Sequence, residues 1–285
     1  MADLLLIRHG QARYGEADYD RLSERGHAQA RYVGRELGKR PPSIVFTGPL
    51  RRQVETYASA RAAAEAEGMA LPEPIEVAEL AEYPAFELIQ ALMPRLSQEE
   101  ARFADLAKAD ARTREAAFQT MIHRWGSGAW NAPGVETAAQ FAARVQAGLH
   151  QAMEAAGGGR LVAVVTSAGP IGVAMGLANG GTTERMIHLS RVIQNASFSQ
   201  VRFRGQDAPP AMRAVGKEAA AAGDGAGTAG ARAGTAGGAA GAGTAGAGTT
   251  TPANHAEPTA WPLGWASMFT FNVTAHLPPE LVTDR

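Results

Sequence analysis

Uninterrupted apolar runs along this chain predict strands that are covered on both faces. Residues 4–7 form the first run, and residues 160–166 form the strongest one. Such a run indicates a buried strand of a parallel sheet, since neither face is left for water. Further strands are predicted at residues 43–47, 75–78, 197–204 and 267–274, the last two as the arms of a hairpin.

Helical patterns lie between these strands. Ser23 is a candidate N-cap for a helix over residues 24–38, which follows a polar, solvated loop. Capping-box patterns at residues 97–100 and 137–140 predict two more helix starts. Further helices are predicted at residues 53–68, 168–178 and 183–191.

These elements predict an α/β fold. We expect a three-layer α/β/α sandwich with a mostly parallel six-stranded sheet and an antiparallel edge strand. Residues 1–205 would form the core. Within it, residues 83–133 would be a helical cap insertion, although an ordinary packed helical subdomain fits that stretch as well. Residues 206–260 are dominated by Ala, Gly and Thr and have too little to bury to offset the entropy of ordering, so we expect a disordered insertion there. Residues 261–285 would supply the final strand and tail.

Composition narrows the classes of function. The formal net charge of −1 over 285 residues favours neither nucleic acid nor an anionic membrane, so any anion site must be a local cluster of basic residues. The absence of cysteine excludes disulfides, a thiolate phosphatase and cysteine-ligated zinc. The histidines show no metal-ligand spacing, and we expect neither a metal nor a cofactor. With no signal-peptide pattern and no apolar run of membrane-spanning length, a cytoplasmic protein is expected.

Basic residues follow the carboxyl ends of two predicted strands. Arg8, His9 and Gly10 come directly after the first strand, and Arg51 and Arg52 follow the second. Ligands of an open α/β sheet bind beyond the carboxyl ends of its strands, so these side chains are expected near one site. An arginine fork matches phosphate geometry, and a histidine can act as a covalent nucleophile. The pattern therefore indicates phosphoryl chemistry.

A third strand end carries small residues. Ser167 and Ala168 follow the strand at residues 160–166 and open the next predicted helix. The first N–H groups of that helix would point into the same crevice, where an anion is stabilised.

Longer motifs surround these residues. Residues 20–30 read D-R-L-S-E-R-G-H-A-Q-A, residues 49–56 read P-L-R-R-Q-V-E-T, and residues 134–137 read G-V-E-T. In these motifs the chain resembles the histidine phosphatase superfamily, also called phosphoglycerate mutase-like. The family patterns are D-x-L-[ST]-x-x-G-x-x-Q-A, S-P-L-x-R-[AT]-x-x-T and G-E-[ST]…R, the last interrupted here by Val135 and completed by Arg144. The likeness extends over about residues 1–204 and excludes the Ala/Gly/Thr stretch.

The resemblance implies roles for the site residues. His9 would be the nucleophile that forms a phosphohistidine, while Arg8 and Arg52 would hold the phosphoryl oxygens. Glu82 would be the general acid that protonates the leaving oxygen and then activates water. The glycine that usually follows this acid is absent, so Glu79 and Glu87 remain alternatives. The residues expected to contact substrate or phosphate are Gly10, Gln11, Arg13, Ser167 and Ala168.

One position departs from the family pattern V-T-H-G-G. The matching residues 165–169 read V-T-S-A-G, so Ser167 stands where the family has its second histidine. A hydroxyl can donate one hydrogen bond to a phosphoryl oxygen, but it carries no positive charge. Three outcomes stay open: turnover is slow, another group compensates, or the pocket only binds. His188 and His276 are candidates for a compensating group, although each fits a structural or surface role.

These considerations leave three functions. The first is a phosphomonoester hydrolase acting on a small phosphorylated metabolite. The second is a phospho-ligand or partner-binding module of the same fold, which Ser167 favours. The third is a phosphoglycerate mutase; against it, residues 11–14 read Q-A-R-Y, whereas the mutases resemble R-H-G-E-S-x-W-N. We expect a small phosphorylated substrate as the partner, no nucleic acid and no membrane. The oligomeric state is open, a homodimer included.

Overall fold

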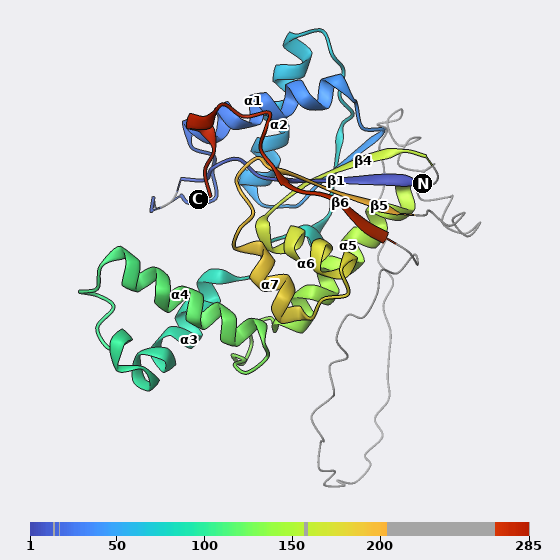
Figure 1. Ribbon diagram of the computed structural model, residues 1–285. Coiled ribbons are helices and arrows are strands. Elements are labelled where there is room, and N and C mark those ends of the chain that lie inside the picture. Colours follow the sequence, from blue (N-terminus) through green and yellow to red (C-terminus); the bar gives the residue numbers. More distant parts are fainter. Residues whose placement is uncertain (14, 17, 157–158, 204–265, 285) are drawn as a thin grey trace, which may run out of the picture. The chain divides into compact units, whose positions relative to one another are not determined.

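A mixed β-sheet forms the centre of the fold. The computed structural model describes residues 1–13, 15–16, 18–156, 159–203 and 266–284. Within them, six strands form one sheet in the order β3-β2-β4-β1-β5-β6 (Figure 1). Strands β1 to β4 pair in parallel, whereas β5 runs antiparallel to β1 and to the edge strand β6. The strands are β1 (Ala2–Arg8), β2 (Ile44–Thr47), β3 (Pro74–Glu76), β4 (Leu161–Thr166), β5 (Phe198–Phe203) and β6 (Ala266–Val273).

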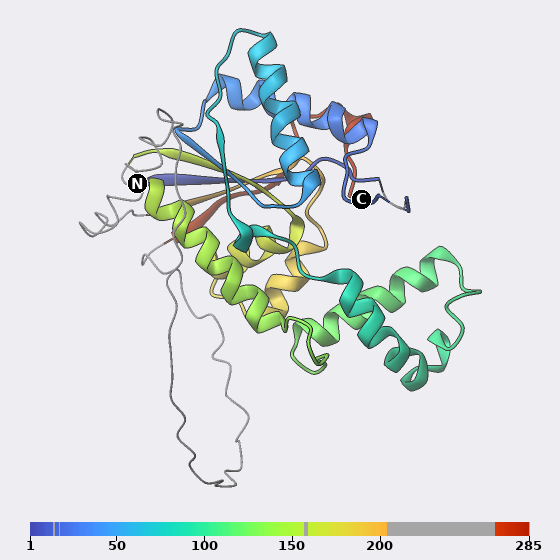
Figure 2. The same cartoon turned by 180° about the vertical axis from the view of Figure 1, so that it is seen from behind.

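Helices cover both faces of this sheet, as Figures 1 and 2 show. Helices α1 (Glu24–Lys39) and α2 (Arg51–Ala66) lie on one side. The opposite side carries α5 (Ala138–Ala156), α6 (Ala168–Ala178) and α7 (Thr183–Ser190). The predicted three-layer α/β/α fold with a mostly parallel sheet and an antiparallel edge is confirmed, and the two predicted hairpin arms are paired neighbours.

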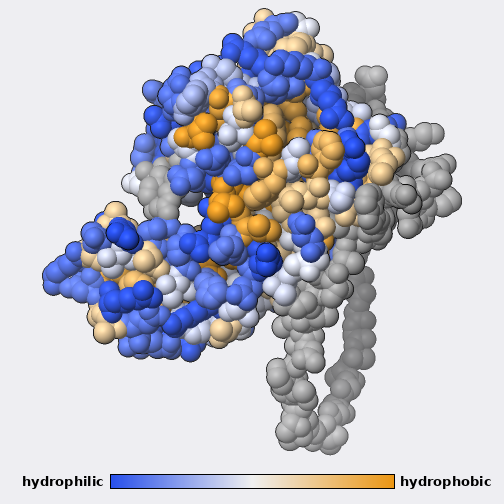
Figure 3. All heavy atoms as spheres, viewed as in Figure 1, coloured by the Kyte–Doolittle hydropathy of each residue, from blue (hydrophilic) through white to orange (hydrophobic). Residues whose placement is uncertain are grey.

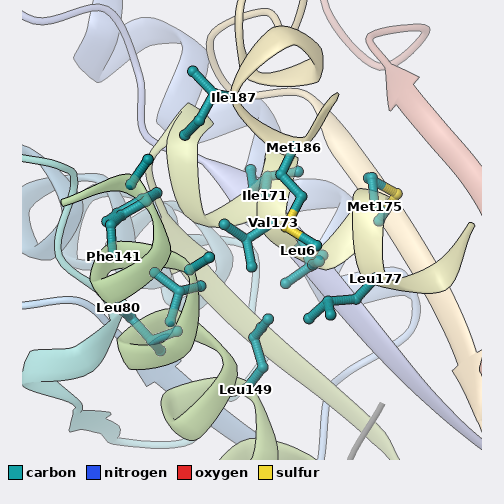
Figure 4. Packing of buried hydrophobic residues seen from close by; sticks show 14 of the residues in the cluster. Leu6, Leu80, Phe141, Leu149, Ile171, Val173, Met175, Leu177, Met186 and Ile187 are labelled. Carbon is teal, nitrogen blue, oxygen red and sulfur yellow. The ribbon is translucent and has the colours of Figure 1, made fainter. Parts of the chain in front are cut away.

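The two layers of helices explain why residues 4–7 of β1 and residues 161–165 of β4 are all apolar. On β1, Leu4 and Leu6 pack towards α5, α6 and α7, whereas Ile7 belongs to the core under α1 and α2. Strand β4 divides in the same way, with Val164 on the first side and Val165 on the second. Figure 4 shows the first core, in which Leu6 meets side chains of α5, α6 and α7. Fully burying one such side chain contributes roughly 1.5–3 kcal/mol.

A pair of helices follows β3 and the short turn η1 (Ala78–Leu80). Helices α3 (Ala85–Glu99) and α4 (Ala111–Gly126) are joined through η2 (Ala101–Phe103) and extend beyond the carboxyl ends of the parallel strands (Figures 1 and 2).

The helix start predicted at residues 97–100 is wrong, because α3 ends at Glu99. The buried stripe of α3 (Leu88, Leu92 and Leu96) runs up to that point, and Leu96 is fully buried. Helix α4 is instead capped by Asp110, whose carboxylate accepts a hydrogen bond from the Thr113 N–H at 2.6 Å. The predicted caps at Ser23 and at Thr137 with Gln140 are confirmed by their hydrogen bonds.

The disordered insertion expected at residues 206–260 lies outside the described residues. In the part of the chain that the structure describes, no helix combines the length and the apolar character needed to cross a membrane. After β6, the turn η3 (Pro279–Leu281) returns the chain to the side of α1.

Candidate active site

The parallel register brings three strand ends to one edge of the sheet. Arg8 pairs with Thr166 in the β1–β4 ladder, and the His9 N–H donates to the Thr166 carbonyl at 2.8 Å. The Gly48 N–H, after β2, donates to the carbonyl of Val165 at 3.0 Å. His9, the β2–α2 turn and the start of α6 therefore emerge side by side, as the sequence predicted from parallel strands.

His9 is held as a neutral imidazole. Its ring is buried, with 4% of the residue exposed. Arg52 Nε donates to His9 Nε2 at 3.1 Å, and His9 Nδ1 lies 2.7 Å from the Gly10 carbonyl oxygen. Because a guanidinium only donates, Nε2 must accept, and this assigns the ring proton to Nδ1. Burial, together with the charges of Arg52 and then Arg8, holds the pKa of His9 well below its ordinary value. At neutral pH Nε2 thus keeps a lone pair, which accepts the Arg52 hydrogen bond in this structure and can attack an electrophile once Arg52 Nε turns to another acceptor.

Arg52 lies in the first turn of α2, which begins two residues earlier than predicted. Its guanidinium is buried and forms an ion pair with Asp20, with Nη1 2.6 Å from Oδ1. The other oxygen of Asp20 accepts from the Arg51 N–H at 2.9 Å. The sequence predicted that Asp20 lies in a solvated loop, and its contact with Arg52 was missed. The signal that could have found this contact was the position of Asp20 as the first residue of the family motif.

The side chain of Arg8 reaches the segment that follows η3. Its Nη1 donates to the carbonyls of Ile193 and of Asp284, the latter at 3.0 Å. Thr283 attaches the same segment to the loop before β5, since its carbonyl accepts from the Asn195 N–H at 2.8 Å. Arg8 Nε is buried and has no hydrogen-bond partner among the described residues. Main-chain carbonyls hold one end of this guanidinium, and Nε keeps an unused donor.

The main chain at Gly10 is fixed by its close packing. A Cβ at this position would lie 2.5 Å from the Gly26 carbonyl oxygen of α1, so only glycine fits. The Gly10 N–H donates to Thr56 Oγ1 at 3.0 Å, and the Gln11 N–H donates to Gln29 Oε1 at 2.7 Å. The loop that carries His9 is therefore bonded to both α1 and α2.

Among the three candidate glutamates, the structure brings Glu82 to the start of α6. Its Oε2 accepts from the Gly169 N–H and its Oε1 from the Tyr83 N–H, both at 3.0 Å. Burial raises the pKa of Glu82, although these two N–H groups and the charges of Arg52 and Arg8 oppose the rise. A carboxyl with a raised pKa is suited to hold a proton and to donate it.

The two alternative glutamates lie elsewhere. Glu79 contributes its main-chain carbonyl, which accepts from Arg144 Nη1 at 2.8 Å, and Glu87 is exposed on α3. Glu87 and Glu82 both line an open cavity of about 320 Å³, together with Pro84, Gly134, Val135, Glu136 and Arg144. The surface is hollowed on the side of the α3–α4 pair (Figure 3).

Ser167 is fully buried at the N-cap position of α6, but its hydroxyl makes no capping bond. Instead, Ser167 Oγ accepts a hydrogen bond from Gln53 Nε2 at 2.8 Å, and Ala168 begins the helix beside it. No pattern in the sequence pointed to Gln53. His188 is exposed on α7, and His276 stacks on Phe198 with ring centroids 4.3 Å apart. In the described part of the chain, neither histidine contacts Ser167, so the structure favours neither as its substitute.

Two predicted substrate contacts lie within the loop after β1. Gln11 Oε1 accepts from the Ser23 hydroxyl at 3.0 Å. The Arg13 guanidinium bonds Glu16 and the Leu22 carbonyl, each at 3.2 Å, so the structure directs it within its own loop rather than to His9. No group of three or more His, Asp or Glu side chains that could bind a metal ion occurs in the described ranges.

The fold and the site define an α/β protein with an imidazole, two guanidiniums and a protonatable carboxyl at the strand ends. The model of the histidine phosphatase superfamily, branch 1, matches residues 4–213. The chain belongs to this superfamily, as its motifs suggested.

Two solved structures, the first two below, show the same fold. The chain is similar to Bacillus stearothermophilus YhfR, with 17% identity, coverage of 73% of this chain and 94% of that one, and a TM-score of 0.51. For a protein described as mycobacterial hydrolase 1, the identity is 22%, the coverages are 72% and 92%, and the TM-score is 0.50. A mycobacterial glucosyl-3-phosphoglycerate phosphatase matches with 23% identity, coverages of 70% and 89%, and a TM-score of 0.48. A search of curated proteins found no match.

Proposed function

We propose that this protein is a phosphomonoester hydrolase that acts on a small phosphorylated substrate through a phosphohistidine. The observation that carries the proposal is the neutral His9 imidazole, whose Nε2 faces Arg52 at 3.1 Å. Membership of the histidine phosphatase superfamily supports the same chemistry.

In the first step, the phosphoryl group enters between Arg8 and Arg52, and Arg52 Nε exchanges His9 Nε2 for a phosphoryl oxygen. His9 Nε2 then attacks phosphorus. The N–P bond forms, the P–O bond to the leaving group breaks, and the leaving oxygen takes the proton of Glu82. The two guanidiniums stabilise the charge that develops on the phosphoryl oxygens.

In the second step, the Glu82 carboxylate takes a proton from a water molecule, whose oxygen attacks the phosphohistidine. The N–P bond breaks, inorganic phosphate leaves, and His9 returns to its neutral state. Glu82 regains the proton that it gave up, so no cofactor or metal enters the balance.

A second candidate, a phospho-ligand binding module without efficient turnover, is favoured by the uncharged hydroxyl of Ser167 where the family motif has a histidine. Both functions are tested by hydrolysis of p-nitrophenyl phosphate across acid to neutral pH, with titration of orthovanadate as a phosphate analogue. The variants are His9→Ala and, as a matched control, His188→Ala on the exposed face of α7.

Turnover that disappears in His9→Ala and persists in His188→Ala is expected for the hydrolase. Folded protein that binds orthovanadate without turnover would favour the binding module. Turnover that survives His9→Ala unchanged would contradict the proposed mechanism.

A further inference from the structure

We propose that Gln53 is a positioning residue that directs the proton of the Ser167 hydroxyl towards the phosphoryl group, a role that rests on the proposed function. The pair would supply, through an uncharged donor, part of the stabilisation that the family motif assigns to a histidine.

The orientation of the Gln53 amide is fixed by its neighbours. Gln53 is fully buried in the first turn of α2. Its Oε1 accepts from the Leu50 N–H at 3.0 Å, and its Nε2 lies 3.4 Å from the Leu80 carbonyl oxygen. A flipped amide would set two donors against each other at Leu50 and two acceptors at Leu80. Nε2 must therefore face Ser167.

This orientation determines what Ser167 can do. The amide NH₂ only donates, so the bond of 2.8 Å makes Ser167 Oγ the acceptor and leaves the hydroxyl proton for another partner. Among the described residues, no acceptor takes that proton. Ser167 lies between Thr166 and Gly169 in the chain. The Thr166 carbonyl accepts from the His9 N–H, and the Gly169 N–H donates to Glu82. A phosphoryl group bound between His9 and Glu82 would bring an oxygen to this proton.

Three departures from the family motifs are linked in space. The turn pattern S-P-L-x-R-[AT] has serine where this chain has Gly48 and alanine or threonine where it has Gln53. A Cβ at Gly48 would lie 2.2 Å from Gln53 Oε1, so the glycine makes room for the longer side chain. Gln53 in turn fills the space next to Ser167, which is shorter than the histidine of the pattern. Gly48, Gln53 and Ser167 therefore form one packed unit, and the replacement of the motif histidine by serine is not an isolated change.

A double-mutant cycle with Gln53→Met and Ser167→Ala tests the proposal. Methionine has a similar length but no donor. Ser167→Ala should lower kcat for p-nitrophenyl phosphate by about 10²-fold, as for the loss of one donor to a developing oxyanion. Gln53→Met should lower kcat in the wild-type background by about tenfold and change it by less than about threefold when Ser167→Ala is already present.

Gln140→Met is the matched control. Gln140 also accepts a main-chain N–H at a helix start, that of Thr137 at 2.9 Å, but it lies on α5 away from Ser167. The Gln140→Met variant should have a lower melting temperature but an unchanged kcat. If Gln53→Met fails to fold, Gln53→Glu keeps the acceptor for Leu50 and takes the Ser167 proton. Its added charge acts in both backgrounds, so kcat should fall further with the serine present than with alanine.

Equal losses from Gln53→Met in both backgrounds, or no loss in the wild-type background, would overturn the proposal. Orthovanadate titration separates it from the proposed function. Wild-type protein that binds orthovanadate without hydrolysing the ester would refute the proposed hydrolase function. The double-mutant cycle would then be measured as changes in orthovanadate affinity instead of kcat. Wild-type protein that neither binds orthovanadate nor hydrolyses the ester would overturn both the proposed function and the role of Gln53.

Discussion

Replacing Gly169 with alanine tests whether the Glu82 carboxylate must occupy its observed position. A Cβ at Gly169 would lie 1.9 Å from Glu82 Oε1 and 2.9 Å from Phe141 Cζ. Carbon makes ordinary contacts at about 3.5 Å, so the carboxylate would have to move by roughly 1.5 Å. Phe141 is fully buried, so its ring has little room to move aside for the methyl group. The carboxyl is therefore the group that yields, and its bond to the Gly169 N–H is lost.

The expected loss follows from that displacement. A misplacement of about 1 Å in a catalytic group commonly costs about 10²-fold in rate, and a general acid contributes about 10²–10⁴-fold. Gly169→Ala should therefore lower kcat by about 10²-fold, approaching Glu82→Gln without exceeding it. The loss should be larger for an alkyl phosphate than for p-nitrophenyl phosphate, because a poor leaving group depends more on protonation.

Gly176→Ala is the control for a methyl group added to the same helix. A Cβ there would lie 2.3 Å from Cγ of Met186, a flexible side chain away from Glu82. It should lower the melting temperature while leaving kcat within about threefold, because overpacking affects stability. If Gly169→Ala kept wild-type turnover on the alkyl phosphate, the assignment of Glu82 as the acid would be refuted.

Two further predictions concern ionisation and the segment after η3. The pH profile of kcat/KM should be bell-shaped. The rate should rise on the acidic side as His9 loses its proton, at a pH below the ordinary pKa of histidine, because only the neutral ring attacks. It should fall on the basic side as Glu82 loses its proton, at a pH above the ordinary pKa of glutamate, because only the protonated carboxyl donates. The optimum should thus lie on the acidic side of neutrality, and Glu82→Gln should abolish the basic limb; a rate that keeps rising above neutral pH in the wild type would contradict these roles. Removing residues 282–285 deprives Arg8 of the Asp284 carbonyl and should lower kcat/KM by about tenfold, measured beside a thermal melt. Unchanged kinetics would show that the segment does not hold Arg8 in place.

Much of the fold could be predicted from the sequence. The apolar run at residues 4–7 determined a strand covered on both faces, and the caps at Ser23 and Thr137 determined two helix starts, because these signals act over a few neighbouring residues. The same local signal failed at residues 97–100, where the continuous stripe of α3 outweighed the capping pattern. Local patterns are reliable only where tertiary packing agrees with them.

The sequence by itself also determined which residue types stand at the strand ends: His9 and Arg8 after the first strand, Arg52 after the second, and Ser167 after a third. Only the tertiary structure decided how these groups are placed. The hydrogen bond that assigns the His9 ring proton to Nδ1, the position of Glu82 at the start of α6 and the bond from Gln53 to Ser167 all depend on atoms that meet across distant segments. The physical reason is that a hydrogen bond between residues 53 and 167, which are far apart in the sequence, produces no repeating pattern of residue types in the chain. Such a bond exists only once parallel strands have brought their carboxyl ends to one edge of the sheet.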